Sequence, residues 1–377
     1  MDILLVAKKL KEEHNLIVLG AGASIGSDRE PFDGFYQEKN KIMPSSDNYF
    51  YDVSRRHRED GAKQYLNTLG LTYEGLNSFI AYVYDLRNNR KGYFPDEWRG
   101  INLESVFTLF DVGTQMLHGH SKYNKLFESN KECLIDFFVL DFFLRCRNQH
   151  CNHLSKVFDK LSDKDNIISF NWDTIADVTL GKCLPSQFNN YIQLMTDSNL
   201  NIKKYQNAGN FIKLHGSINW FVCENKKCEK YRQLQIPINE NNELDMSIRV
   251  PECPCCKKSR KPLIIPPSSN KLLNRNSLIH KLWLLSRDKL LRTKRIIFIG
   301  YSFPPNDFVS DWLFRHIYLT EEFHNDFLLP EIIVVNPEIK RPNSLVSKRF
   351  KSLFPNVKIK KFATLEEFCE TGLHLID

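Results

Sequence analysis

The chain lacks the features that mark membrane and secreted proteins. No apolar run approaches the roughly 20 residues that a membrane-spanning helix needs. The apolar part of the N-terminus, Ile3 to Ala7, is short for a signal peptide, and charged residues follow it at once. We therefore expect a cytoplasmic protein without a membrane segment.

A large excess of charge of either sign is also missing. The chain has 52 basic and 45 acidic residues, for a net charge of +7. Such a mild excess does not require a nucleic-acid partner. The basic segment Ser347–Lys351 is typical of a solvated face. We therefore expect no direct, sequence-specific binding of nucleic acid.

Internal repeats and low-complexity tracts are absent as well, which excludes a repeat or disordered protein. Hydrophobic residues make up 42% of the chain and charged residues 26%, as in ordinary globular proteins. The 377 residues exceed what one compact core usually holds. They indicate one large domain with insertions, or two domains.

Three apolar segments are followed at once by glycine or polar residues. Leu16–Leu19 leads into a glycine-rich loop, Asn166–Phe170 leads into Asn171, and Phe211–Leu214 leads into His215. Each segment has the length and composition of a buried strand. In an open α/β sheet the carboxyl ends of the strands meet at one crevice, where ligands bind. The three strand ends therefore predict a single site.

Two further strands are predicted in the C-terminal half, at Arg295–Gly300 and Glu331–Asn336. Apolar residues between Leu278 and Leu285 recur at helical spacing, which predicts an amphipathic helix. Strands that alternate with helices favour a parallel sheet. We therefore expect an α/β fold with a Rossmann-like parallel sheet.

The domain organisation that we expect is a single Rossmann-like core, made of residues 1–44, 162–222 and 262–377, with two insertions. The first, 45–161, is helical and contains the run Cys133–Leu144, which is apolar nearly all round. Such a run favours either a homo-oligomer interface or the centre of a small helical domain.

The second insertion, 223–261, is polar and resembles a zinc ribbon. Cys223 and Cys228 form one knuckle, and Cys253 and Cys256 form another, with Cys255 as a spare thiol. Two thiolate pairs at this spacing fit tetrahedral Zn²⁺. Four thiolates leave no open coordination position, so we expect a structural zinc.

Taken one at a time, the residues at the strand ends also have ordinary structural explanations. The loop Gly20–Gly26 is compatible with a tight turn. Asn171 and Asp173 are compatible with caps of the following helix. A buried His215 is compatible with a structural hydrogen-bond donor, and Asp307 is compatible with a helix N-cap.

Together, and in this order, the segments resemble the sirtuin-like superfamily of NAD-consuming enzymes. The matching features are the glycine loop, Asn-x-Asp after a strand, His-Gly, the cysteine knuckles, Gly-Tyr-Ser and the late Val-Asn. The resemblance implies that Asn171 and Asp173 face the nicotinamide ribose, and that His215 is the catalytic base. It further implies an NAD-binding set: Gly20, Ala21, Gly22, Ser24, Gly300, Ser302 and Asn336.

The chain differs from the protein deacylases of that superfamily in two places. Residues 26–33 lack the Gly-Ile-Pro-Asp-Phe-Arg element, and Phe-Asn-Trp-Asp stands where deacylases have Gln-Asn-Ile-Asp. No counterpart of the strand that clamps an acyl-lysine peptide is evident. These traits resemble the bacterial sirtuin-like effectors of anti-phage defence, which hydrolyse NAD and form oligomers, sometimes with a HerA-type ATPase.

Three functions remain open at this point. The resemblance favours an NAD+ glycohydrolase, a hydrolase that depletes NAD in defence against phage. An NAD-dependent protein-lysine deacylase would use the same site and would need a peptide-binding element. A non-catalytic nucleotide sensor would not need both Asn171 and His215.

Overall fold

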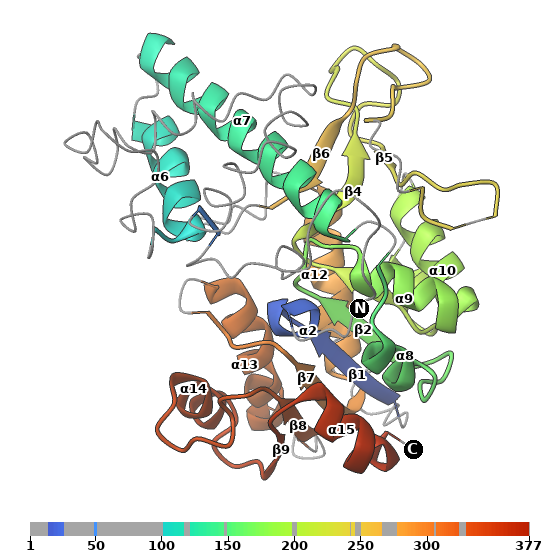
Figure 1. Cartoon of the computed structure of the whole chain (residues 1–377), viewed down its shortest axis with the longest axis vertical. Coiled ribbons are helices and arrows are strands. Elements are labelled where there is room, and N and C mark those ends of the chain that lie inside the picture. Colours follow the sequence, from blue (N-terminus) through green and yellow to red (C-terminus); the bar gives the residue numbers. More distant parts are fainter. Residues whose placement is uncertain are drawn as a thin grey trace. The chain divides into compact units, whose positions relative to one another are not determined.

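The computed structural model describes a set of ranges separated by gaps: residues 14–25, 49–50, 101–116, 121–146, 149–197, 202–241, 243–245, 250–265, 277–304, 307–323 and 329–376. The chain divides into two compact units. Unit 1 comprises Met1–Glu30, Cys146–Ile264 and Leu272–Asp377, and unit 2 comprises Pro31–Arg145 and Ile265–Lys271. Figure 1 shows the whole chain, coloured along the sequence.

The centre of unit 1 is a six-stranded sheet in which all paired strands are parallel. In spatial order the strands are β3 (Phe211–Lys213), β2 (Asn166–Ser169), β1 (His14–Leu19), β7 (Thr293–Ile299), β8 (Glu331–Val335) and β9 (Ile359–Phe362). Counted along the chain, this is the order 3-2-1-4-5-6 of doubly wound dinucleotide-binding folds. The prediction of a Rossmann-like parallel sheet is confirmed.

The strands follow from apolar runs that a parallel sheet buries on both faces. The side chains of Leu16–Leu19 in β1 are fully buried, and those of Ile296–Ile299 in β7 are almost fully buried. β1 pairs with β2 on one side and with β7 on the other. The strand order reverses between β1 and β7, which is the switch point where ligands bind in this architecture.

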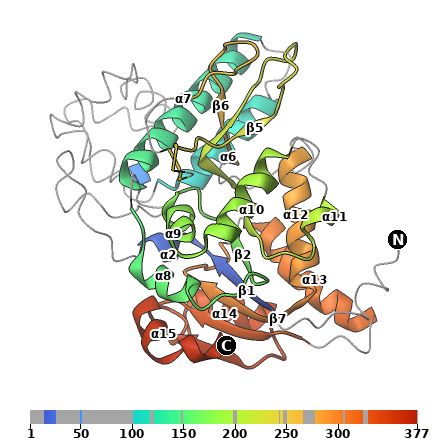
Figure 2. The same cartoon turned by 90° about the vertical axis from the view of Figure 1, so that its right-hand side faces the viewer.

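Helices connect the strands of unit 1 and lie on both faces of its sheet, with α8 and α15 on one face and α12 and α13 on the other (Figure 2). They are α2 (Ala21–Ile25), α8 (Asn152–Phe158), α9 (Ile175–Cys183), α10 (Pro185–Thr196), α11 (Ile202–Tyr205), α12 (Ser277–Leu290), α13 (Phe308–Phe323), α14 (Leu345–Leu353), α15 (Leu365–Thr371) and the 3₁₀ helix η5 (Leu373–Leu375). The predicted helix around Leu278–Leu285 is confirmed as part of α12.

A second, antiparallel sheet in unit 1 has the order β5-β4-β6. Its strands are β4 (Gly216–Val222), β5 (Leu234–Gln235) and β6 (Lys261–Ile264). β4 begins at the residue after His215, so the small sheet continues directly from the end of β3. The polar segment with the cysteine knuckles joins β4 to β6.

Unit 2 contains α6 (Leu103–Met116) and α7 (Ser121–Cys146), whose last residue belongs to unit 1. The predicted helical run Cys133–Leu144 lies within α7. Its Phe138 and Phe142 rings pack on Tyr49, and Phe138 also contacts Phe107. These buried rings have partners within the unit, so they do not by themselves indicate an oligomer. About half of the expected insertion, 45–161, lies outside the described residues.

Within the described ranges, the structure contains no helix with the length and apolarity that a membrane crossing requires.

Candidate active site and metal centre

The glycine loop after β1 packs directly against the turn after β7. The Gly20 amide donates to the Ile299 carbonyl at 3.0 Å, and the Gly22 amide donates to the Gly300 carbonyl at 2.9 Å. Gly300 has a φ of +65°, and a Cβ there would lie 2.0 Å from the Ala23 nitrogen. Only glycine fits this position. The loop is therefore held at the switch point of the sheet.

Asn171, Ser24 and Asp173 form one buried hydrogen-bonded network at the ends of β1 and β2. The Asn171 Nδ2 donates to the Gly20 carbonyl at 2.9 Å and to the Ser24 Oγ at 3.1 Å. The Ser24 hydroxyl donates to Asp173 Oδ2 at 2.8 Å. Asn171 and Asp173 are only 5% and 3% exposed. The strand ends predicted to meet do meet here.

Asp173 also bonds the start of the following helix, although the N-cap of α9 is Thr174, whose side chain makes no capping hydrogen bond. The Asp173 Oδ1 accepts a hydrogen bond from the Ile175 amide at 3.1 Å, at the first residue of α9. The two carboxylate oxygens therefore have different partners: Oδ1 accepts from the first amide of α9, and Oδ2 accepts from the Ser24 hydroxyl.

A buried ion pair between Lys213 and Asp177 contacts the segment after β2. The Lys213 Nζ donates to Asp177 Oδ2 at 2.7 Å and to the Asp173 carbonyl at 2.6 Å. The Tyr191 hydroxyl donates to Asp177 Oδ1 at 3.0 Å, and the Trp220 indole N–H donates to the Tyr191 hydroxyl at 2.7 Å. Lys213 and Asp177 are fully buried. Lys213 thus ties the backbone of the Asn171–Asp173 segment to the core of unit 1.

Burial raises the pKa of the Asp177 carboxyl, and the charge and hydrogen bond of Lys213 oppose this shift. Burial and the neighbouring Asp177 raise the pKa of the Tyr191 hydroxyl well above its usual value. Tyr191 therefore stays a neutral hydrogen-bond donor to Asp177 at physiological pH.

His215 lies at the end of β3 among aromatic rings. Its ring is stacked with Trp172 at 5.9 Å between centroids and is edge-on to Phe170 at 5.3 Å. The Trp172 indole N–H donates to the His215 carbonyl at 3.1 Å. The next residue, Gly216, has a φ of +76°, and a Cβ there would lie 2.2 Å from the Leu263 carbonyl oxygen. The chain must turn here with glycine, which fixes the position of His215.

The ring of His215 also faces a carboxylate that the sequence analysis did not assign to the site. Asp307 Oδ2 lies 3.7 Å from His215 Nε2, and both side chains are buried. Asp307 directly precedes α13, so an N-cap was the simpler explanation from sequence. The Gly-Tyr-Ser strand end six residues earlier was the available signal that this segment reaches the site.

The residues assigned to the adenosine side lie farther along the same sheet edge. Ser302 follows β7, and its carbonyl accepts a hydrogen bond from Arg349 at 3.4 Å. Asn336 follows β8, and its Oδ1 accepts from the Glu338 amide at 2.9 Å. Neither of these two hydrogen bonds involves Asn171 or His215. Ala21 opens the short helix α2.

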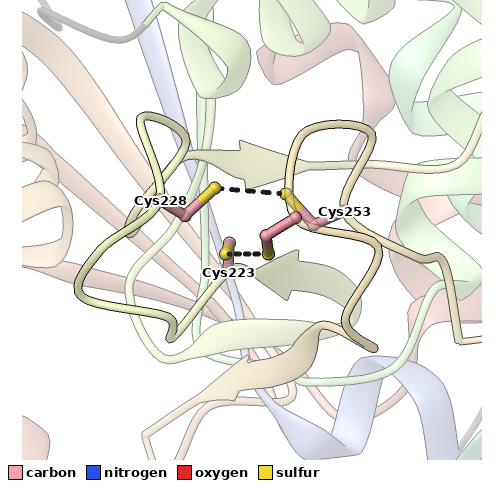
Figure 3. Close-up of side chains that lie close together, drawn as sticks. Cys223, Cys228 and Cys253 are labelled. Atoms are coloured by element: carbon pink, nitrogen blue, oxygen red, sulfur yellow. Dashed lines mark hydrogen bonds between the residues drawn. The ribbon is translucent and has the colours of Figure 1, made fainter.

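The four cysteines of the two knuckles come together in unit 1 (Figure 3). The sulfurs of Cys223 and Cys256 are 3.7 Å apart, as are those of Cys228 and Cys253, and all four lie within 4.8 Å of one another. Zinc–sulfur bonds of about 2.3 Å in a tetrahedron place neighbouring sulfurs about 3.8 Å apart. The cluster therefore fits a four-coordinate zinc. Cys255 is exposed and outside the set.

The second knuckle has the geometry of a thiolate-binding turn. Lys257 has a φ of +58°, and its amide donates to the Cys253 carbonyl at 2.9 Å. Backbone N–H groups of Cys256 and Cys255 lower the pKa of the Cys253 thiol to about 6. The Lys258 N–H lowers the pKa of Cys256. These groups stabilise the thiolate form that zinc binds.

Comparison with solved structures adds a weak likeness. No protein-family model and no curated protein sequence matches the chain. Among solved structures, a mutant of a Sir2 homologue in complex with ADP-ribose is similar, with a TM-score of 0.38 and 13% sequence identity. The match covers 100% of this chain and 96% of that one.

Proposed function

We propose that this protein is an NAD+ glycohydrolase, which cleaves the nicotinamide–ribose bond to give nicotinamide and ADP-ribose. The observation that carries the proposal is the buried network of Asn171, Ser24 and Asp173. It lies at the switch point of a sheet with the strand order of dinucleotide-binding folds. His215 lies two residues after the adjacent strand, β3. The sequence resemblance to sirtuin-like enzymes supports the same assignment.

The chemistry needs few groups. Nicotinamide carries the positive charge of NAD+ and departs as a neutral molecule, so no general acid is required. Positive charge develops on the ribose in the transition state, and an enzyme gains rate by stabilising that charge and orienting water. The water oxygen bonds to the anomeric carbon, the electron pair of the broken bond goes to the nicotinamide nitrogen, and a base takes the proton of the water.

Each residue of the network has one role in this proposal. Both hydrogen bonds of the Asn171 side chain come from Nδ2, so its Oδ1 is the atom that orients a ribose hydroxyl or the water. Asp173 holds Ser24 and stabilises positive charge on the ribose. His215 is the base that accepts the proton.

The rest of NAD+ extends along the sheet edge. The loop at Gly20, Ala21, Gly22 and Ser24 holds the pyrophosphate, because its backbone allows close approach and α2 begins there. Gly300, Ser302 and Asn336, at the ends of β7 and β8, lie along the adenosine.

The biological setting follows from the same resemblance. The proposal includes an NAD-depleting role in bacterial anti-phage defence, in the cytoplasm, as a homo-oligomer that acts alone or with a HerA-type ATPase. The missing peptide-clamping element favours hydrolysis over deacylation.

Nicotinamide release should not depend on a peptide. We expect purified protein incubated with NAD+, with its activator if it needs one, to release nicotinamide at the same rate with and without an acetyl-lysine peptide. Chromatography of nicotinamide measures this. Strict dependence on the peptide would instead identify a deacylase, and no release in the presence of the activator would refute the enzyme assignment.

The zinc site gives a second prediction. Protein purified without chelator should contain one zinc per chain, bound by Cys223, Cys228, Cys253 and Cys256, as the sulfur spacing allows. Cys228→Ser should lose the metal, and segment 223–261 should become sensitive to limited proteolysis because little apolar core supports it. Elemental analysis by mass spectrometry measures the metal.

The chain offers a matched control for this experiment. Cys255→Ser alters an exposed thiol in the same knuckle and should keep both the zinc and the protease resistance. Wild-type protein without zinc, or Cys228→Ser protein that keeps metal and stability, would contradict the assignment.

A further inference from the structure

Asp307 is fixed by contacts from its own helix and from the end of β7. The amide of Ser310 donates to its Oδ1 at 3.4 Å, and the amide of Asp311 donates to its backbone carbonyl at 3.1 Å. The Tyr301 hydroxyl donates to Oδ2 at 3.1 Å. Oδ2 is also the atom 3.7 Å from His215 Nε2. Oδ1 of Asp307 therefore accepts from an amide in the first turn of α13, and Oδ2 faces His215.

The aromatic residues around this pair hold it in place. The Tyr301 ring is stacked on Phe170 at 4.4 Å, and Phe170 is edge-on to His215. Phe170, His215 and Tyr301 follow β2, β3 and β7, so three strand ends fix the two side chains relative to each other. A helix cap needs only Oδ1, and the orientation of Oδ2 toward a buried imidazole exceeds what capping requires.

We propose that Asp307 is a positioning residue for His215. Its carboxylate orients the imidazole and stabilises the positive charge that the ring gains when it takes a proton during NAD+ hydrolysis. Tyr301 holds the carboxylate in the orientation that does this. The inference rests on the proposed function, since it assigns a partner to the base of that reaction. A carboxylate beside a catalytic histidine acts in this way in many unrelated enzymes.

The test compares Asp307→Asn and Asp307→Ser with wild type, under conditions in which the wild-type chain releases nicotinamide from NAD+. Both replacements are good N-caps, so α13 keeps its cap in each. We expect kcat to fall about tenfold or more in both, and KM to change less than about threefold, because Asp307 acts on the base and not on NAD+ binding. Tyr301→Phe should lower kcat by a smaller factor.

A double-mutant cycle separates action through His215 from a general structural effect. In a His215→Ala background, Asp307→Asn should cause no further loss of kcat, because the residue it serves is gone. The Thr364 hydroxyl caps α15 by accepting a hydrogen bond from the Glu367 amide at 3.0 Å. Thr364→Ala removes this cap and should leave kcat unchanged.

Three outcomes overturn the inference, and they are distinguishable. An active wild type with unchanged kcat in both Asp307 variants refutes the role of Asp307 and leaves the proposed function standing. If Asp307→Asn lowers kcat by the same factor in the wild-type and His215→Ala backgrounds, the role of Asp307 is likewise refuted and the proposed function remains. A wild type that releases no nicotinamide under any condition refutes the proposed function, and this inference with it.

Discussion

Replacing His215 or Asn171 by alanine is expected to lower the rate of NAD+ cleavage roughly 10²-fold or more while the fold survives. His215→Ala removes the proposed base, and Asn171→Ala removes the amide that orients the ribose or water. Both residues lie at strand ends, so truncation removes little core volume. The measurement is the initial rate of nicotinamide release, with circular dichroism to check the fold.

Substitutions of the same residue types at exposed sites away from the proposed site serve as controls. His374→Ala and Asn152→Ala alter exposed residues of η5 and α8 and should leave the rate unchanged. A folded His215→Ala protein with near-normal activity would remove His215 from the mechanism. The same result for Asn171→Ala would leave the buried network with a structural role only.

Lys213→Ala is expected to lower the free energy of unfolding by about 3–5 kcal/mol, because it leaves Asp177 buried without its cation. Burial already raises the pKa of Asp177, and Lys213 counteracts this. Without Lys213 the folded-state pKa should rise further. A carboxyl whose pKa is higher in the folded than in the unfolded protein stabilises the fold when it is protonated. For Asp177 this stabilisation is complete below the unfolded-state pKa and is lost as the pH rises through the folded-state pKa. The destabilisation should therefore be smaller in acid.

Urea denaturation of the variant at several pH values measures this effect. Lys213→Met combined with Asp177→Leu removes both charges and should recover part of the lost stability. Lys164→Ala, at an exposed site, should change stability by less than about 0.5 kcal/mol. If Lys213→Ala is as stable as wild type, the ion pair does not anchor the Asn171–Asp173 segment.

The fold could be predicted where the sequence carries long apolar runs. β1, β2, β3, β7 and β8 all coincide with predicted strands. β1, β7 and β8 each contain four consecutive apolar residues, and β2 and β3 are short apolar segments that polar residues or glycine follow. β5 spans only two residues, and β9 reads Ile-Lys-Lys-Phe, half of it charged. Neither has a local signal. Their pairing with β4 and β8 is set by tertiary contacts.

The site could be predicted in part for a related reason. The carboxyl ends of parallel strands share one edge of the sheet, so the meeting of Gly20, Asn171 and Ser24 could be predicted from a parallel sheet without knowing the strand order. The approach of Asp307 to His215 depends on how the 300–307 segment turns, which no residue pattern specifies. Lys213 was read only as part of an apolar strand, and its charge is balanced by Asp177, on α9.

Two predictions from sequence concern parts of the chain that the structure leaves largely undescribed. The Gly26–Asp33 stretch, which separates this chain from deacylases, lies outside the described residues. About half of the expected helical insertion, 45–161, lies outside them as well. The homo-oligomer and the HerA-type partner therefore stay predictions.

The most direct test of the central claim is the identity of the products formed from NAD+. Mass spectrometry of a reaction without peptide should find nicotinamide and ADP-ribose in equal amounts, and Asn171→Ala should form both roughly 10²-fold or more slowly. Acyl-ADP-ribose formed only when an acyl-lysine peptide is added, or intact NAD+ with wild-type protein and its activator, would contradict the assignment as a glycohydrolase.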